Sequence, residues 1–248
     1  MRTPVIFTAF FLLFIGVFSG ADAQIIPKVT MGVEEATTPE EAAVTLEILF
    51  LITILTLAPS ILIMMTSFTR IVVIMHFLRS ALGTQSMPPN QVLIGLSLFL
   101  TLFIMMPVFT DVNDNALQPY LAEEIDYKQG LKNAMDPIRN FMLRQTTEKD
   151  LALFLRMSNS PSPSTVDDLP NTVIIPSFII SEMKKAFTIG FILYLPFLII
   201  DMVVASILMS MGMMMLPPIM ISLPFKLILF VLADGWHLIV KQVVLSFN

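Results

Sequence analysis

The sequence predicts an all-α, membrane-associated protein built from kinked helical hairpins, and three observations support this prediction. Of its 248 residues, 56% are hydrophobic and 13% are charged, whereas about a quarter of an ordinary soluble domain is charged. The apolar residues are gathered in four long blocks. Each block contains a proline, which kinks a helix when it lies in the interior. A soluble globular enzyme is therefore disfavoured.

Composition also excludes several functions. The net charge of −5 leaves no basic surplus for phosphates, so nucleic acid is not an expected partner. The absence of cysteine removes disulfides, thiolate nucleophiles, iron–sulfur clusters and cysteine-bound zinc. With two histidines and no motif for metal-dependent hydrolysis, nucleotide binding or serine catalysis, we expect no enzymatic activity, metal or cofactor.

Residues 1–23 have the pattern of a cleaved secretory signal peptide. Arg2 gives a positive start, Val5–Phe18 is apolar, and Ala21–Ala23 is a small-x-small cleavage site. The mature chain is then expected to begin at Gln24, on the extracytoplasmic side. The alternative is a first transmembrane helix that is retained.

The four apolar blocks decide the expected architecture. They are Leu46–Met65, Val92–Phe109, Phe187–Met211 and Ile219–Ala233, and their prolines are Pro59, Pro107, Pro196 and Pro224. A spanning helix needs about 20 apolar residues, so the first three blocks qualify and the fourth does so only if 238–245 extends it. A proline inside a spanning helix frees a carbonyl that neighbouring helices must satisfy. Packing within an assembly is therefore favoured over isolated spans.

Charge placement divides the chain into parts. The segment Ser67–Gln91 carries no acid, and its charged or titratable side chains are Arg70, His76 and Arg79. The positive-inside rule therefore places it in the cytoplasm. The segment Asp111–Lys185, with eleven acids and eight bases, is then extracytoplasmic. The expected parts are a first hairpin at 44–110, a helical segment at 111–185 and a second hairpin at 186–245.

Local signals predict the helices of the central segment. Asp136 followed by Pro137 is typical of a helix start. Thr147 with Asp150 resembles a capping box for a second short helix. Pro176 is expected to begin the long helix that leads to the third block.

Two ionisable residues lie inside apolar blocks, where charge is expensive. Asp201 is in the third block and Lys226 in the fourth. Because their charges are opposite and a tight turn joins the blocks, we expect a buried structural pair. The alternative is an ion or solute transporter that uses Asp201 as a proton relay.

A run of three methionines, Met213, Met214 and Met215, lies between Gly212 and the prolines Pro217 and Pro218. Glycine and proline mark this run as a loop. Methionine is flexible and adapts to irregular surroundings. Repeated around a ring, the loop would form a compliant hydrophobic constriction, and such constrictions gate pores by dewetting. The alternative is apolar filler.

Several long strings resemble the FliP family of flagellar export-gate proteins, across residues 46–240. They are MMTSFTR at 64–70, ALGT at 81–84, PPNQVLIGLSLFLT at 88–101, FMLRQT at 141–146, GFILYLPFLIIDMVVASILMSMGMMMLPP at 190–218 and LPFKLILFVLADGW at 223–236.

The resemblance implies an inner-membrane protein of the flagellar basal body that serves type III secretion. Family members form a symmetric ring of five copies with the partners FliQ and FliR, in contact with membrane lipid. Unfolded flagellar chains leave the cytoplasm through this gate. The family's methionine gasket falls on Met213–Met215. A homologous injectisome subunit is the alternative within the same resemblance.

Overall fold

The computed structural model describes residues 39–84, 86–158, 165–213 and 215–247, and within these ranges every regular element is helical. The expected all-α fold is thus confirmed. The signal peptide and Gln24 lie outside the described residues. The elements are α2 (Pro39–Met64), α3 (Phe68–Leu82), α4 (Asn90–Val112), the π-helical turn η1 (Asn113–Leu117), α5 (Gln118–Leu121), α6 (Tyr127–Gln145), α7 (Glu148–Met157), the 3₁₀ turn η2 (Val166–Asp168), α8 (Asn171–Ser210), α9 (Pro218–Leu232) and α10 (Gly235–Leu245).

The chain divides into two compact units, residues 1–51 and residues 52–248. The described part of the first unit is the beginning of α2. The second unit contains the end of α2 and all later helices.

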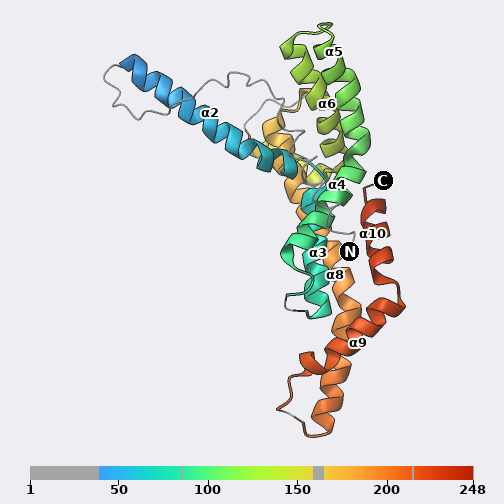
Figure 1. The fold of residues 1–248 in the computed structure, drawn as a ribbon. Helices are drawn as coiled ribbons and strands as arrows, with labels where there is room; N and C mark the ends of the chain where they lie inside the picture. The colour runs from blue at the N-terminus through green and yellow to red at the C-terminus, as the bar shows by residue number, and fades with distance from the viewer. Residues whose placement is uncertain (1–38, 85, 159–164, 214, 248) are drawn as a thin grey trace, which may run out of the picture. The chain divides into compact units, whose positions relative to one another are not determined.

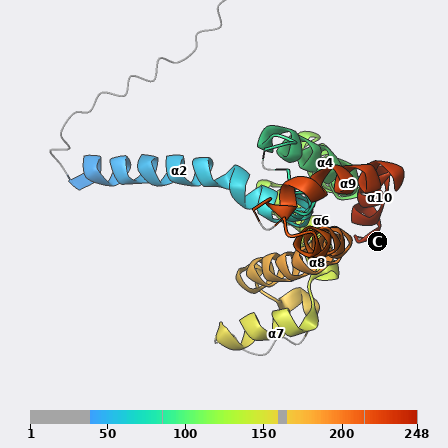
Figure 2. The same ribbon diagram turned by 90° about the horizontal axis from the view of Figure 1, so that it is seen from below.

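Helix α3 is the centre of the second unit. It lies against α4 and the long helix α8 (Figures 1 and 2). Ile71, Ile74, Met75 and Leu78 recur at helical spacing and are each at most 1% exposed, so one face of α3 is buried. Gly83 ends the helix with a φ of 75°, a left-handed conformation that costs glycine little.

Helices α3 and α8 approach closely where α8 has a glycine. A Cβ placed on Gly190 would lie 2.5 Å from Cγ of Phe77. The same ring makes an edge contact with Phe187, at 5.3 Å between centroids. Because Gly190 has no side chain, the Phe77 ring can pack directly against the backbone of α8.

A second core lies under the central helices. Met105 of α4, Phe141 and Met142 of α6, and Ile174 and Phe178 of α8 are buried together. Helix α7 packs on the same half of α8. The two short amphipathic helices expected from the central segment are thus α6 and α7, which dock on the apolar helices.

Among the described residues, three helices are long and apolar enough to cross a membrane: Ala43–Met64, Asn90–Leu121 and Asn171–Ser210. Helices α9 and α10 together pass the same test but are bent by 66°. The bend occurs at Asp234, whose φ of 50° is left-handed. The fourth predicted block is therefore helix α9, and a sharp bend separates it from the helix that contains 238–245.

Two predicted helix starts are wrong. Helix α6 begins at Tyr127, where Asp126 accepts a hydrogen bond from the Gln129 N–H at 2.8 Å, and Pro137 lies inside the helix. Helix α8 begins at Asn171, so Pro176 is also internal. A proline indicates a helix start only from its immediate neighbours in the sequence. Packing onto the second core instead allows both helices to begin several residues before the proline.

Candidate functional site

Asp201 and Lys226, the two charges predicted from the apolar blocks, lie next to each other. Lys226 Nζ is 2.6 Å from Asp201 Oδ2 and also donates to the carbonyl of Ala81 at 3.1 Å. Ser222 Oγ donates to Asp201 Oδ1 at 2.5 Å. The Lys226 side chain is 2% exposed and that of Asp201 is 21% exposed. The group therefore joins the last turn of α3 to α8 and α9.

Ser222 was not predicted as part of this group, although the sequence contains a signal for it. It precedes Lys226 by four residues on α9, so both lie on one face of the helix. Both carboxylate oxygens of Asp201 have a donor. Such an arrangement satisfies a charge inside an apolar assembly.

The methionine run lies in the turn between α8 and α9. Gly212 has a φ of 75°, its N–H bonds to the carbonyl of Met209, and the N–H of Met213 bonds to that of Leu208. This pair of bonds is a Schellman motif, which ends a helix and satisfies its last carbonyls. The turn is therefore fixed by the end of α8 and does not depend on the methionine side chains.

The two described methionines of the run differ in exposure. Met215 is 99% exposed and Met213 is 37% exposed. Met214 lies outside the described residues. Within a single chain Met215 is thus almost uncovered and Met213 is partly covered, and neither belongs to the buried cores.

A buried ion network is the main feature that the sequence did not predict. Arg70 of α3 is fully buried and faces Glu182 of α8 with two nitrogens, Nε to Oε2 at 2.8 Å and Nη2 to Oε1. Nη2 also donates to Gln145 Oε1 at 2.8 Å, and Nη1 donates to the carbonyl of Ser246 at 2.6 Å. The guanidinium lies 3.8 Å from the centre of the Phe247 ring. One side chain thus joins α3, α6, α8 and the segment after α10.

Arg70 adds no exposed positive charge to the segment Ser67–Gln91. Arg70 is one of the charges on which the expected cytoplasmic placement of this segment rests, but its side chain is buried in α3 and paired with Glu182. The signal was present: Arg70 precedes Ile74 and Leu78 at intervals of four, which places it on the buried face of α3. Lys185 of α8 also contacts this network, because its Nζ donates to the carbonyl of Gln145 at 2.7 Å.

A second buried carboxylate fixes α7 to α8. Asp150 is 1% exposed and accepts hydrogen bonds from Thr147 Oγ1 and Ser181 Oγ, both at 2.8 Å, and from Lys184 Nζ. The hydrogen bond from Lys184 lowers the pKa of Asp150, more than burial raises it. The carboxylate is thereby held in its charged form.

These features define a class of protein: an all-helical membrane protein whose charges hold its helices together, with an exposed methionine turn. The model of the FliP family matches residues 51–243, and the chain belongs to this family. It is 56% identical over 209 residues to the flagellar biosynthetic protein FliP of Bacillus subtilis, covering 84% of this chain and 95% of that one. The protein of the same name from Caulobacter vibrioides is 54% identical over 80% of this chain and 74% of its own. That of Treponema pallidum is 46% identical over 94% of this chain and 86% of its own.

Proposed function

We propose that the chain is a core subunit of the flagellar type III protein export gate in the bacterial inner membrane. The observation that carries the proposal is the match to the FliP family over 51–243, with relatives named as flagellar proteins along most of their length. These names favour the flagellar apparatus over an injectisome. In this proposal five copies form a ring with FliQ and FliR, in contact with lipid, and unfolded flagellar chains pass through it.

The apolar helices support a place in a membrane-embedded assembly. The part of α2 that lies in the second unit, residues 52–64, has no buried side chain, and the candidate span at Asn171–Ser210 has 11% of its most apolar window buried. Large apolar surfaces on a single chain are interfaces with lipid or with other subunits. A signal peptide at 1–23 would place the mature N-terminus, Gln24, outside the cytoplasm.

We further propose that the turn carrying Met213, Met214 and Met215 seals the closed gate. The Schellman geometry at Gly212 supports this role, because it holds the turn in place while leaving Met215 almost fully exposed. Flexible thioether side chains from five copies would close around an axis and yield to a passing chain. The Asp201–Lys226 pair would hold α8 and α9 on either side of this turn.

The transporter alternative requires an acid that can take up and release a proton. Asp201 instead receives hydrogen bonds on both oxygens, from Ser222 and Lys226. This geometry favours a structural pair over a relay.

The export function is tested by deleting the gene in its own bacterium and measuring flagellar proteins secreted into the medium. We expect secretion to stop and to return with the full chain. Secretion that continues without the gene would refute the proposal.

The seal is tested by replacing Met213, Met214 and Met215 with alanine together. We expect normal assembly, retained or slightly reduced export, and a leak of small ions seen as a lower membrane potential. The matched control replaces Met202, Met209 and Met220, exposed methionines of α8 and α9, and should not leak. Failure to assemble would make the run structural filler, and export without a leak would place the seal elsewhere.

A further inference from the structure

A small helical hairpin, formed by η1, α5 and the first part of α6, carries an exposed apolar patch. Its side chains are between 45% and 67% exposed: Leu117, Tyr120, Leu121, Tyr127 and Leu131. Two of the three tyrosines of the chain are among them. The buried cores described above do not use this patch.

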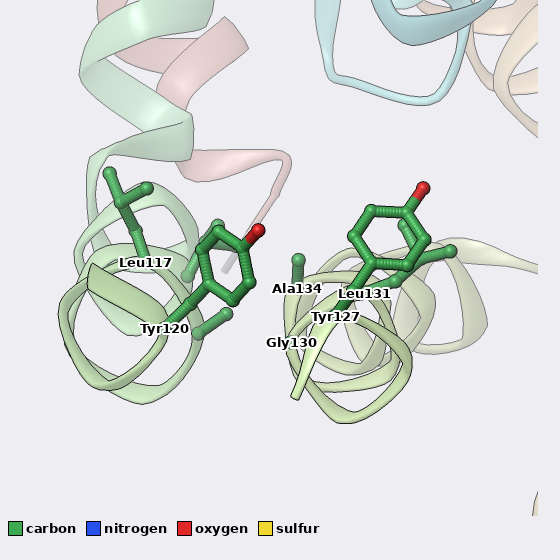
Figure 3. Close-up of a pocket in the computed structure, with 8 residues that line it drawn as sticks. Leu117, Tyr120, Tyr127, Gly130, Leu131 and Ala134 are labelled. Atoms are coloured by element: carbon green, nitrogen blue, oxygen red, sulfur yellow. The ribbon is translucent and has the colours of Figure 1, made fainter. Parts of the chain in front are cut away.

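The patch surrounds a pocket. Tyr120 of α5 and Tyr127 of α6 stand on opposite sides of it, and Leu117, Leu131 and Ala134 complete the wall (Figure 3). Its volume is about 270 Å³, slightly below the roughly 300–1,000 Å³ of small-molecule sites. A pocket of this size suits one or two large side chains of a partner.

Gly130 forms the floor of the pocket. It is buried, and a Cβ placed there would lie 3.6 Å from the Tyr120 ring and 3.8 Å from Ile125. The glycine thus leaves the space between the two tyrosines open. Since these distances are ordinary contacts, an alanine at position 130 would narrow the pocket without disturbing the helix.

The same hairpin is acidic. Residues 111–134 contain five exposed acids and two lysines, Lys128 and Lys132, so their net charge is −3. The acids are Asp111, Asp114, Glu123, Glu124 and Asp126. A second copy of this hairpin would bring like charges together, which is unfavourable. Anionic lipid headgroups are repelled for the same reason.

We propose that this hairpin is a docking site for a polypeptide of another protein, which inserts a large apolar side chain between Tyr120 and Tyr127. Lysine or arginine residues beside that anchor pair with the acids of the hairpin. Apolar burial at the centre supplies affinity, and charge complementarity at the rim selects the partner. The site is separate from the methionine turn and the ion pairs, and it does not depend on the proposed export function.

The experiment uses the full chain in its own bacterium, with the photo-cross-linker benzoylphenylalanine in place of Leu131. A second chain carries it in place of Leu153, an exposed residue of α7 outside the hairpin. After irradiation the chain is purified, and the cross-linked species is identified by mass spectrometry down to its peptide sequence. We expect position 131, and not 153, to capture one segment of another protein, with a large apolar residue next to lysine or arginine.

Two variants then test the pocket and the rim. Gly130→Ala should lower the cross-link yield by about fivefold or more, because an added methyl group overfills a fitted pocket. The matched control Gly95→Ala, a helical glycine with nothing within 4 Å of its added Cβ, should leave the yield unchanged. Glu124→Lys should lower the yield, and Glu148→Lys on α7 should not.

Four results would overturn the proposal. They are a cross-link to a second copy of this chain, a lipid adduct, no product above that from position 153, or a yield that Gly130→Ala does not change.

Discussion

Replacing Arg70 by methionine should be among the most damaging single substitutions in the chain. Methionine keeps an apolar stem of similar length but removes every donor of the guanidinium. Glu182 would then remain fully buried, with the Lys185 ammonium 3.9 Å away as its nearest remaining positive charge. Removing one member of a buried ion pair costs about 3–5 kcal/mol, since the other charge stays without a partner.

The structure separates this cost from other losses. Gln145 Oε1 keeps a hydrogen bond from Lys185 at 3.2 Å, but the carbonyl of Ser246 loses a donor. Replacing Arg70 by methionine and Glu182 by leucine together removes both charges. The loss of unfolding free energy in the double variant should therefore be smaller than the sum of the losses in the two single variants. We expect the difference to be at least about 2 kcal/mol.

The free energy of unfolding can be measured on the purified full chain in detergent micelles, by titration with sodium dodecyl sulfate followed by far-ultraviolet circular dichroism. Arg156→Met, on the exposed side of α7, is the matched control and should change stability by less than about 0.5 kcal/mol. If Arg70→Met costs under about 1 kcal/mol, or if the two single losses add, Arg70 and Glu182 are not the coupled pair described here.

Four further predictions concern other parts of the chain. Asp201→Ala and Lys226→Ala should each reduce assembly, and the double variant should lose less assembly than the two single losses added together. Normal assembly with lost export in Asp201→Asn would favour a relay. Gly190→Ala should cost about 1–3 kcal/mol because its Cβ would meet Phe77 at 2.5 Å, while Gly95→Ala should be neutral or slightly stabilising; equal effects in unfolding titrations would contradict the close approach. The folded-state pKa of Asp150 is lowered, so its contribution to stability is present above the unfolded pKa of about 3.9 and is lost as the pH falls through the folded value. The difference in stability between the native chain and Asp150→Asn should therefore shrink from pH 7 to pH 3. A constant difference would exclude a charged Asp150. Mass analysis of the purified chain should find Gln24 as its first residue, and an intact segment 1–23 would refute cleavage.

The sequence predicted the features that depend on local composition. Helical apolar blocks, the turn at Gly212 and the proximity of Asp201 to Lys226 follow from residue types along the chain. Helix starts at Pro137 and Pro176 were wrong, because packing against distant helices overrides a local proline signal. The Arg70 network joins residues up to 176 positions apart, and nothing in their neighbourhoods identifies the partners. Only the spacing of Arg70 relative to Ile74 and Leu78 indicated that this charge was buried.

The members of the Arg70 network are synthesised at very different times. Its acceptors are translated after it: Gln145 is 75 positions later, Glu182 is 112 and Ser246 is 176. At about 5–20 residues per second, roughly ten to thirty-five seconds separate the arginine from its last acceptor. During this interval α3 carries a positive charge without its final partners, so water or the insertion machinery must accommodate it. The Arg70 network can therefore be complete only after the segment that follows α10 has been synthesised.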